Sequence, residues 1–231
     1  MEGAPDSAVE RLPPLYAAWM EALLGDSIPR EALASCDHCA MRPVDGAGPK
    51  PGALYFDPAV KCCTFQPELH NFLAGRALCD GDPAAQAGRA SVEKRIDGRV
   101  GVTPLGLLRS PVFLVLYNNS DESFGLSRSL RCPHYLEDGG RCGIWAHREA
   151  TCATWFCKHV RGAVGRTFWI ESLHKLLSAV ERDLSRWCVL QLFSSDETLR
   201  RLAAMPSCRH LTNTSTNEPV KSSSRPIGRR T

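Results

Sequence analysis

The stretch RCPHYLEDGGRCGIWAHREATCATWFCKH, residues 131–159, holds four of the chain's 11 cysteines, namely Cys132, Cys142, Cys152 and Cys157. Cys132 opens the segment Cys-Pro-His-Tyr-Leu, and Cys142 opens the segment Cys-Gly-Ile-Trp. Glycine, proline and the close cysteine spacing favour an irregular centre over a long regular element. The stretch therefore predicts a fold organised around its cysteines.

Four further cysteines precede this stretch, as a Cys-x-x-Cys pair and an adjacent pair. A Cys-x-x-Cys turn lets two thiolates converge on one ion, and thiolates suit zinc, copper(I) and iron–sulfur clusters. Eight cysteines are therefore candidate metal ligands: Cys36, Cys39, Cys62, Cys63, Cys132, Cys142, Cys152 and Cys157. The other three, Cys79, Cys188 and Cys208, lie outside the pattern, and we interpret the first two as packing residues.

The ordered set of cysteines resembles the YkgJ-type family of zinc- or iron-chelating cysteine-cluster proteins. Cys132-Pro133-His134-Tyr135-Leu136 and Cys142-Gly143-Ile144-Trp145 match that family's pattern. The resemblance covers roughly Cys36 to His159, with Glu149 where the family has proline and 22 residues between Cys39 and Cys62. The segments KCCTFQPELHNFLAG and WFCKHVRGAVGRTFW also look like a subgroup of bacterial proteins. The resemblance implies a zinc or iron centre, an iron–sulfur cluster included, and no single reaction.

Several alternatives stay open. In one hypothesis, the metal centre has a structural or redox role. In the alternative, the protein is a metalloenzyme whose metal keeps an open coordination position. The cysteines are buried packing thiols in the plainest interpretation. Four neighbouring histidines are candidate ligands, second-layer hydrogen-bond donors or surface residues: His38, His134, His147 and His159. Cys157 with His159 is the one local pair that suggests a cysteine nucleophile.

The composition predicts the compartment of the protein and the kinds of partner it could bind. The opening MEGAPDSAVERLPP lacks a secretory signal, so we expect a cytoplasmic protein, in which clustered cysteines bind metal more often than they form disulfides. We expect no membrane span, because no apolar run reaches about 18 residues. The residues from Pro206 onward carry five basic residues and one acidic residue, and the rest of the chain has a net charge of −1. We therefore expect no specific nucleic acid, while a protein partner stays open.

The predicted fold class is mainly α with minor β, an irregular single domain around a metal centre, with a long C-terminal helix packed on the N-terminal helices. We expect disorder over 1–12, the metal-binding domain over 13–205 and a disordered basic tail over 206–231. The expected helices begin at Pro13, Pro29 and Pro67 and cover 84–97 and 167–192, and a strand is expected over Val112 to Tyr117. The stripe expected to be buried on the last helix is Leu173, Leu177, Val180, Leu184 and Trp187.

Overall fold

The structure, a computed structural model, describes residues 12–24, 36, 39, 41, 55–120, 123–156, 159–192, 196–197 and 200. The chain divides into two compact units, Met1–Leu192 and Phe193–Thr231. The cysteine-rich stretch over residues 131–159 belongs to the first unit. The predicted helix at Pro29 and, apart from Leu12, the predicted disordered ends lie outside the described residues.

The first unit is mainly helical with two small antiparallel sheets, which confirms the predicted class, mainly α with minor β. Its α-helices are α1 (Pro14–Leu24), α2 (Asn71–Leu78), α3 (Gln86–Asp97), α4 (Pro111–Asn118), α5 (Ala150–Thr154), α6 (Gly162–Arg166) and α7 (His174–Leu192). Its strands are β1 (Leu69–His70), β2 (Val102–Thr103), β3 (Gly106–Leu107), β4 (Tyr135–Leu136) and β5 (Arg141–Cys142). Short 3-10 turns cover Pro83–Ala85, Arg128–Leu130, Asp138–Gly140 and Trp145–His147, and a π-helical stretch covers Thr167–Leu173.

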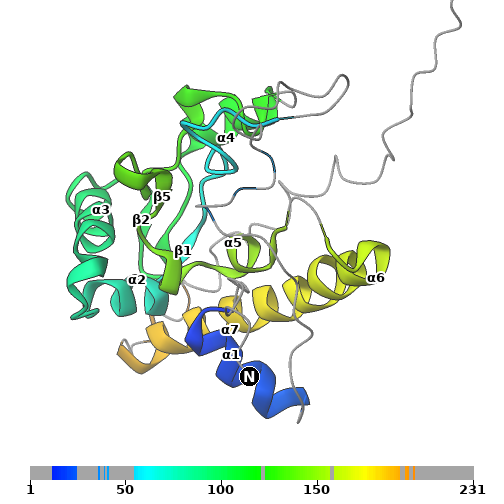
Figure 1. Ribbon diagram of the computed structural model, residues 1–231. Helices are drawn as coiled ribbons and strands as arrows, with labels where there is room; N and C mark the ends of the chain where they lie inside the picture. The colour runs from blue at the N-terminus through cyan, green and yellow to red at the C-terminus, as the bar shows by residue number, and fades with distance from the viewer. Residues whose placement is uncertain are drawn as a thin grey trace, which may run out of the picture. The chain divides into compact units, whose positions relative to one another are not determined.

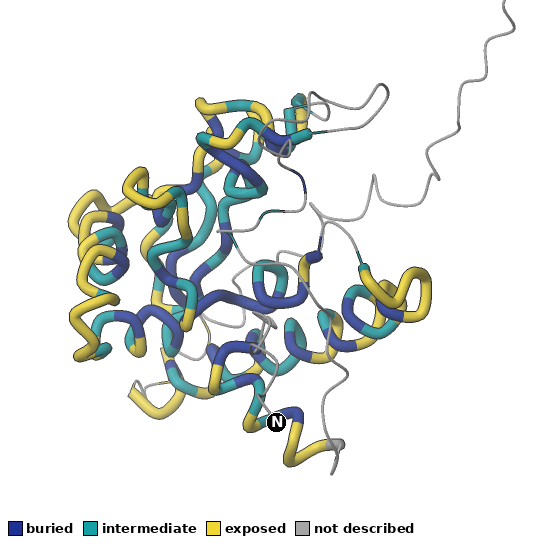
Figure 2. Tube along the Cα trace, in the orientation of Figure 1, coloured by how far each residue is buried: buried dark blue, intermediate teal, exposed yellow. Residues whose placement is uncertain are grey.

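The first hydrophobic core joins the N-terminal helix to the C-terminal one. Tyr16 and Met20 of α1 pack with Phe156, Trp169 and Leu177. Proline at the first position of α1 fits the helix start, because its missing N–H has no partner there anyway. Figure 1 shows α5 beside this pair of helices, and Figure 2 shows that its inner side is buried. The predicted packing of the long helix on α1 is therefore confirmed.

The long C-terminal helix is confirmed, but its predicted buried stripe is only half right. The helical path begins at Gly162, earlier than predicted, and runs through the π-helical stretch into α7. Leu173 and Leu177 are buried as predicted, whereas Trp187 is 56% exposed. The buried face continues in steps of four through two polar residues, Glu181 and Ser185, to Val189. The prediction assumed that only apolar side chains lie on the inner face of the helix. Glu181 and Ser185 also lie there, because each has a hydrogen-bond partner.

The second core lies around α2, α3 and the three-stranded sheet. Strand β3 lies between β1 and β2 and pairs antiparallel with both, with Leu107 opposite Leu69 and Val102. Leu69, Leu107 and Val92 of α3 are buried together. The helix predicted after Pro67 begins only at Asn71, because Leu69 and His70 pair in the sheet first. The helix predicted over 84–97 is confirmed, with a 3-10 turn in its first residues.

The strand predicted over Val112 to Tyr117 is wrong, because this segment is helix α4. Ser110 is its N-cap, and the Ser110 side chain accepts a hydrogen bond from the Phe113 N–H at 3.1 Å. Pro111 at the first helical position adds a second start signal. These two signals outweigh the β preference of valine, tyrosine and phenylalanine, which depends strongly on context.

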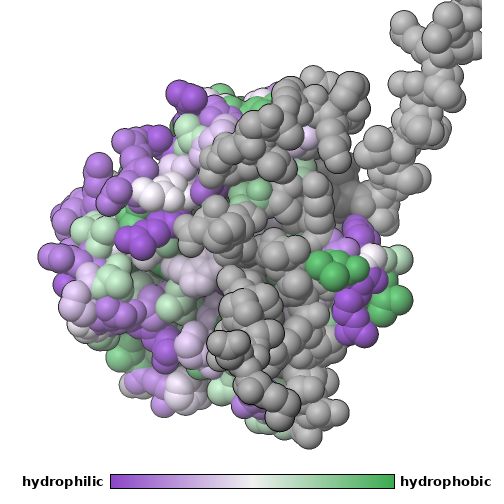
Figure 3. Space-filling view, in the orientation of Figure 1, coloured by the Kyte–Doolittle hydropathy of each residue, from purple (hydrophilic) through white to green (hydrophobic). Residues whose placement is uncertain are grey.

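The hydropathy of the exposed side chains differs between the helices of the first unit. Figure 3 shows mainly hydrophilic side chains over α3 and apolar side chains over α6, where Val164 is 68% exposed. Among the described residues, no helix is both long enough and apolar enough to cross a membrane.

Two helix glycines should respond oppositely to alanine. A Cβ on Gly88 of α3 would lie 1.8 Å from the carbonyl oxygen of Gly143, which follows β5, whereas a Cβ on Gly75 of α2 meets nothing within 4 Å. We expect Gly88→Ala to destabilise the protein by about 1–3 kcal/mol, because the helix must move off the hairpin. We expect Gly75→Ala to stabilise it by up to about 1 kcal/mol through helix propensity. Urea unfolding of both variants measures this, and equal effects would contradict the close contact of α3 with the hairpin.

Candidate metal centre

The hairpin of β4 and β5 positions two of the predicted ligands. Tyr135 lies opposite Cys142 in the antiparallel register, and the Gly143 N–H donates to the His134 carbonyl at 2.8 Å. Gly139 and Gly140 both have positive φ, at 72° and 57°, so the turn needs residues that tolerate the left-handed region. Cys132 therefore stands just before the first strand, and Cys142 stands within the second.

The backbone of the hairpin also favours thiolates at these two positions. Burial raises the pKa of the Cys132 and Cys142 thiols, and backbone hydrogen bonds from His134 to Cys132 and from Ile144 to Cys142 oppose this rise. In both cases the donor lies two residues after the cysteine. Hydrogen bonds to the charged form of an acid favour ionisation, and such bonds to sulfur are typical of metal-binding cysteine turns.

The adjacent cysteines join the hairpin from a tight turn. The Cys132 N–H donates to the Cys63 carbonyl at 2.6 Å, and the Cys63 N–H donates to the Val60 carbonyl at 3.0 Å. Lys61 in this turn has a φ of 53°, which is uncommon for a residue with a side chain. Its ammonium donates to the carbonyl oxygens of Cys36 and Gly140, so one side chain links three cysteine-bearing segments.

The fourth segment is helix α5, which carries Cys152. The Glu149 carboxylate caps the helix and accepts from the N–H groups of Thr151 and Cys152, at 2.7 and 2.8 Å. Glu181 of α7 accepts from the Ala150 N–H at 2.8 Å, so the long helix holds the same helix start. Arg148 donates to the carbonyl oxygens of Trp145 and Cys152 and lies over the Trp145 ring, 3.5 Å from its centroid.

The described thiols interact electrostatically as one group. Burial, followed by the charges of Cys62 and Cys142, raises the pKa of Cys36 to about 12. Burial and then Cys142 raise the pKa of Cys132 to about 12. Hydrogen bonding to Cys62 and then burial raise the pKa of Cys63, and burial raises the pKa of Cys152. Hydrogen bonds link the segments of Cys36, of Cys62 and Cys63, and of Cys132 and Cys142, and the charges of Cys142, Cys132 and Cys62 contribute to the raised pKa of Cys152.

Three basic residues oppose the rise in the pKa of the cysteine thiols. Lys61 lowers the pKa of Cys36, Arg95 lowers that of Cys132, and Arg148 lowers that of Cys142. The sequence prediction missed all three. Lys61 and Arg148 lie near cysteines in the sequence, but nothing in their spacing separates them from surface cations, and Arg95 comes from helix α3, far from any cysteine motif.

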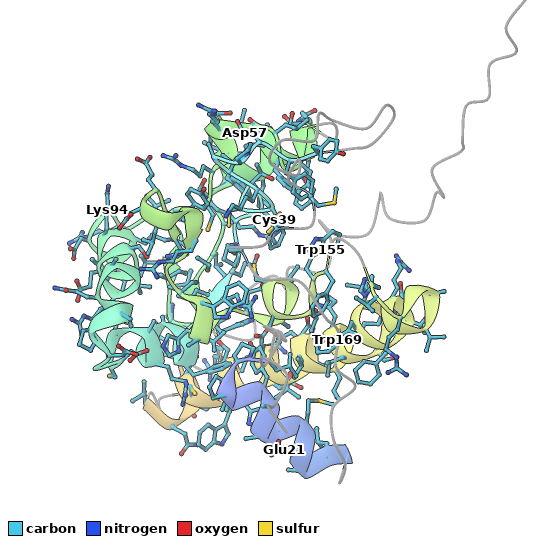
Figure 4. All side chains as sticks on the ribbon, viewed as in Figure 1. Glu21, Cys39, Asp57, Lys94, Trp155 and Trp169 are labelled. Atoms are coloured by element: carbon cyan, nitrogen blue, oxygen red, sulfur yellow. The ribbon has the colours of Figure 1, made fainter. Side chains whose placement is uncertain are left out.

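The remaining predicted ligands are not joined to this group by the described contacts. Cys39 is half-buried and is labelled in Figure 4, between Asp57 and Trp155 in that view. Cys157 and His38 lie outside the described residues, so the Cys157–His159 pair stays a prediction. Cys79 follows α2 and is exposed, and Cys188 lies on α7 and is half-buried. Within the part of the chain that the structure describes, no three His, Cys, Asp or Glu side chains are placed to hold a metal ion.

His134 and His147 differ in the partners of their ring nitrogens. His134 is fully buried, with Nδ1 2.7 Å from the Ser91 hydroxyl and Nε2 3.1 Å from Arg95 Nη1. Because arginine can only donate, Nε2 of His134 accepts, and the ring has no lone pair left for a metal. Burial, aided by Arg95, lowers the pKa of His134 to about 3. His147 differs, because its Nε2 lies 2.7 Å from Asp80 Oδ2 and its buried Nδ1 has no partner among the described residues.

A scan against models of known protein families, a search of curated proteins and a search of solved structures found no match for this chain. The resemblance to the YkgJ-type family therefore stays a prediction, carried by the cysteine pattern alone.

Glu181, which supports the start of α5, should make stability depend on pH. Burial raises its pKa to about 8, with the Ala150 N–H acting against this, so the folded chain binds the proton more tightly than the unfolded chain. The resulting stabilisation is complete below the unfolded pKa of about 4.5 and is lost as pH rises through about 8. We expect Glu181→Gln to remove this loss, worth on the order of 3 kcal/mol at pH 8. Urea unfolding at pH 5 and pH 8 measures it.

The control for this prediction is Glu93→Gln, which removes an exposed carboxylate from α3. It should leave the pH dependence as in the wild type. A wild-type stability that is unchanged between pH 5 and pH 8, or a Glu181→Gln variant with the same slope, would show that Glu181 ionises freely in the folded chain.

Proposed function

We propose that this protein binds a thiophilic metal, as zinc or as an iron–sulfur centre, through cysteine thiolates, in a structural or redox role. The observation that carries the proposal is that hydrogen bonds hold the turn of Cys62 and Cys63 and the segment of Cys36 against the hairpin of Cys132 and Cys142. Sulfur is the donor that zinc and iron–sulfur clusters share, so this donor set suits such a centre.

The electrostatics of the thiols support the proposal. Burial raises the pKa of each of Cys36, Cys132, Cys142 and Cys152, so these thiols do not ionise by themselves at neutral pH. None of these four forms a disulfide, so each can donate its sulfur. A bound cation reverses the balance against ionisation, because a coordinating thiol loses its proton. An ion would draw the segments together, and the energy of binding would then contribute to folding.

The ligand assignment is tested by single Cys→Ser variants. We expect Cys132→Ser and Cys142→Ser to lose most of the bound metal, because each removes a thiolate from the hairpin around which the others gather. We expect Cys79→Ser and Cys188→Ser to keep the wild-type metal content, because one residue is exposed and the other lies on α7. Metal per chain in protein purified without oxygen is the measurement. Equal retention in the two sets would contradict the assignment.

The identity of the centre is tested on the wild-type protein. Iron with acid-labile sulfide and absorbance near about 400 nm would indicate a cluster, whereas a colourless protein with stoichiometric zinc would indicate a structural ion. In either case we expect a strong chelator to lower the free energy of unfolding, because the unfolded chain lacks the site. A chain that carries neither metal after anaerobic purification, and takes up neither on reconstitution, would refute the proposal.

A further inference from the structure

Two buried cations lie beside the cysteines without a carboxylate partner in the described part of the chain. Lys61 is 4% exposed, and its ammonium donates to the carbonyl oxygens of Cys36 and Gly140. Arg95 is 9% exposed, and its guanidinium contacts His134 Nε2 and the Leu108 carbonyl, at 3.1 and 3.0 Å. All of these partners are neutral groups.

Burying an ion is costly unless an opposite charge lies nearby. The same chain supplies such a charge elsewhere, because the half-buried Arg109 is paired with Glu68 at 3.0 Å. Lys61 donates to the carbonyl of Cys36, and Arg95 contacts His134, two residues after Cys132, so the acidic groups placed beside these cations are cysteine thiols. Neutral thiols cannot balance two buried cations, whereas thiolates can.

We infer that Lys61 and Arg95 are built-in counter-ions of a net-anionic metal–thiolate centre, in which the thiolates outnumber the positive charges of the bound ion. The inference rests on the proposed function and sharpens it. Four thiolates around Zn²⁺ give a net charge of −2, which nearby cations stabilise, whereas two thiolates and two imidazoles give a neutral centre that needs no counter-ion. His134 fits the all-thiolate set, because Arg95 occupies the ring nitrogen that an ion would need.

The test separates charge from hydrogen bonding by paired substitutions in the reduced full-length protein. Lys61→Gln and Arg95→Gln remove the charge and keep a donor, whereas Lys61→Arg and Arg95→Lys keep the charge and change the donor geometry. Lys94→Gln, on the exposed side of α3 next to Arg95, is the matched control, and Lys94 is labelled in Figure 4. Zn²⁺ affinity is measured by competition with a chromophoric chelator, and the stability of each metal-free variant by urea unfolding.

We expect each Gln variant to bind Zn²⁺ about tenfold or more weakly, because a buried unit charge beside the cysteine-bearing segments is lost. The metal-free Gln variants should be at least as stable as the wild type, because the uncompensated buried charge is gone. Lys61→Arg, Arg95→Lys and Lys94→Gln should stay within about threefold of the wild-type Zn²⁺ affinity.

Two outcomes would overturn the inference. The first is wild-type Zn²⁺ affinity in both Gln variants, and the second is the same loss in the charge-retaining variants as in the Gln variants. If a Gln variant does not fold, the charge-retaining variant decides, because the inference requires its Zn²⁺ affinity to match the wild type. A wild-type protein that binds neither zinc nor iron would instead refute the proposed function itself.

Discussion

The backbone hydrogen bond from Cys132 to the Cys63 carbonyl joins the two parts of the chain on which the centre depends. It fixes the turn that carries the adjacent cysteines against the hairpin that carries Cys132 and Cys142. Helix α3 then approaches the hairpin so closely at Gly88 that a methyl group does not fit. The hairpin is thus held by a turn on one side and a helix on another, and from that helix Arg95 contacts His134, two residues after Cys132.

Burying these thiols and cations costs electrostatic free energy. Thiols that are buried together resist ionisation, and cations that are buried beside neutral groups lose their hydration. Ionising the thiols costs less when the cations lie beside them, and burying the cations costs less when the thiols are ionised. An ion that deprotonates the cysteines would relieve both at once, so metal binding and folding should be strongly coupled in this region.

The sequence predicted the mainly helical fold with minor β, but not the basic residues that surround the cysteines. Cysteine spacing is a local signal, and so are the proline residues at the starts of α1 and α4. The strand predicted at Val112 failed because Ser110 and Pro111 start a helix there. The inner face of α7 was mispredicted because Glu181 and Ser185 are buried with partners far along the chain. Such contacts depend on the tertiary fold and leave no periodic pattern in the sequence.

The charge of the proposed centre would limit the reactions it can support. A metal acts as a Lewis acid when it keeps positive character and an open position, as in sites built from histidines and water. Thiolates in excess of the metal charge reduce that character and fill the coordination sphere. On the proposed assignment, Lys61 and Arg95 stabilise the anionic form and do not restore an open position. A centre of this kind is better suited to holding segments together or to exchanging electrons than to activating water, which favours the structural or redox role over hydrolytic catalysis.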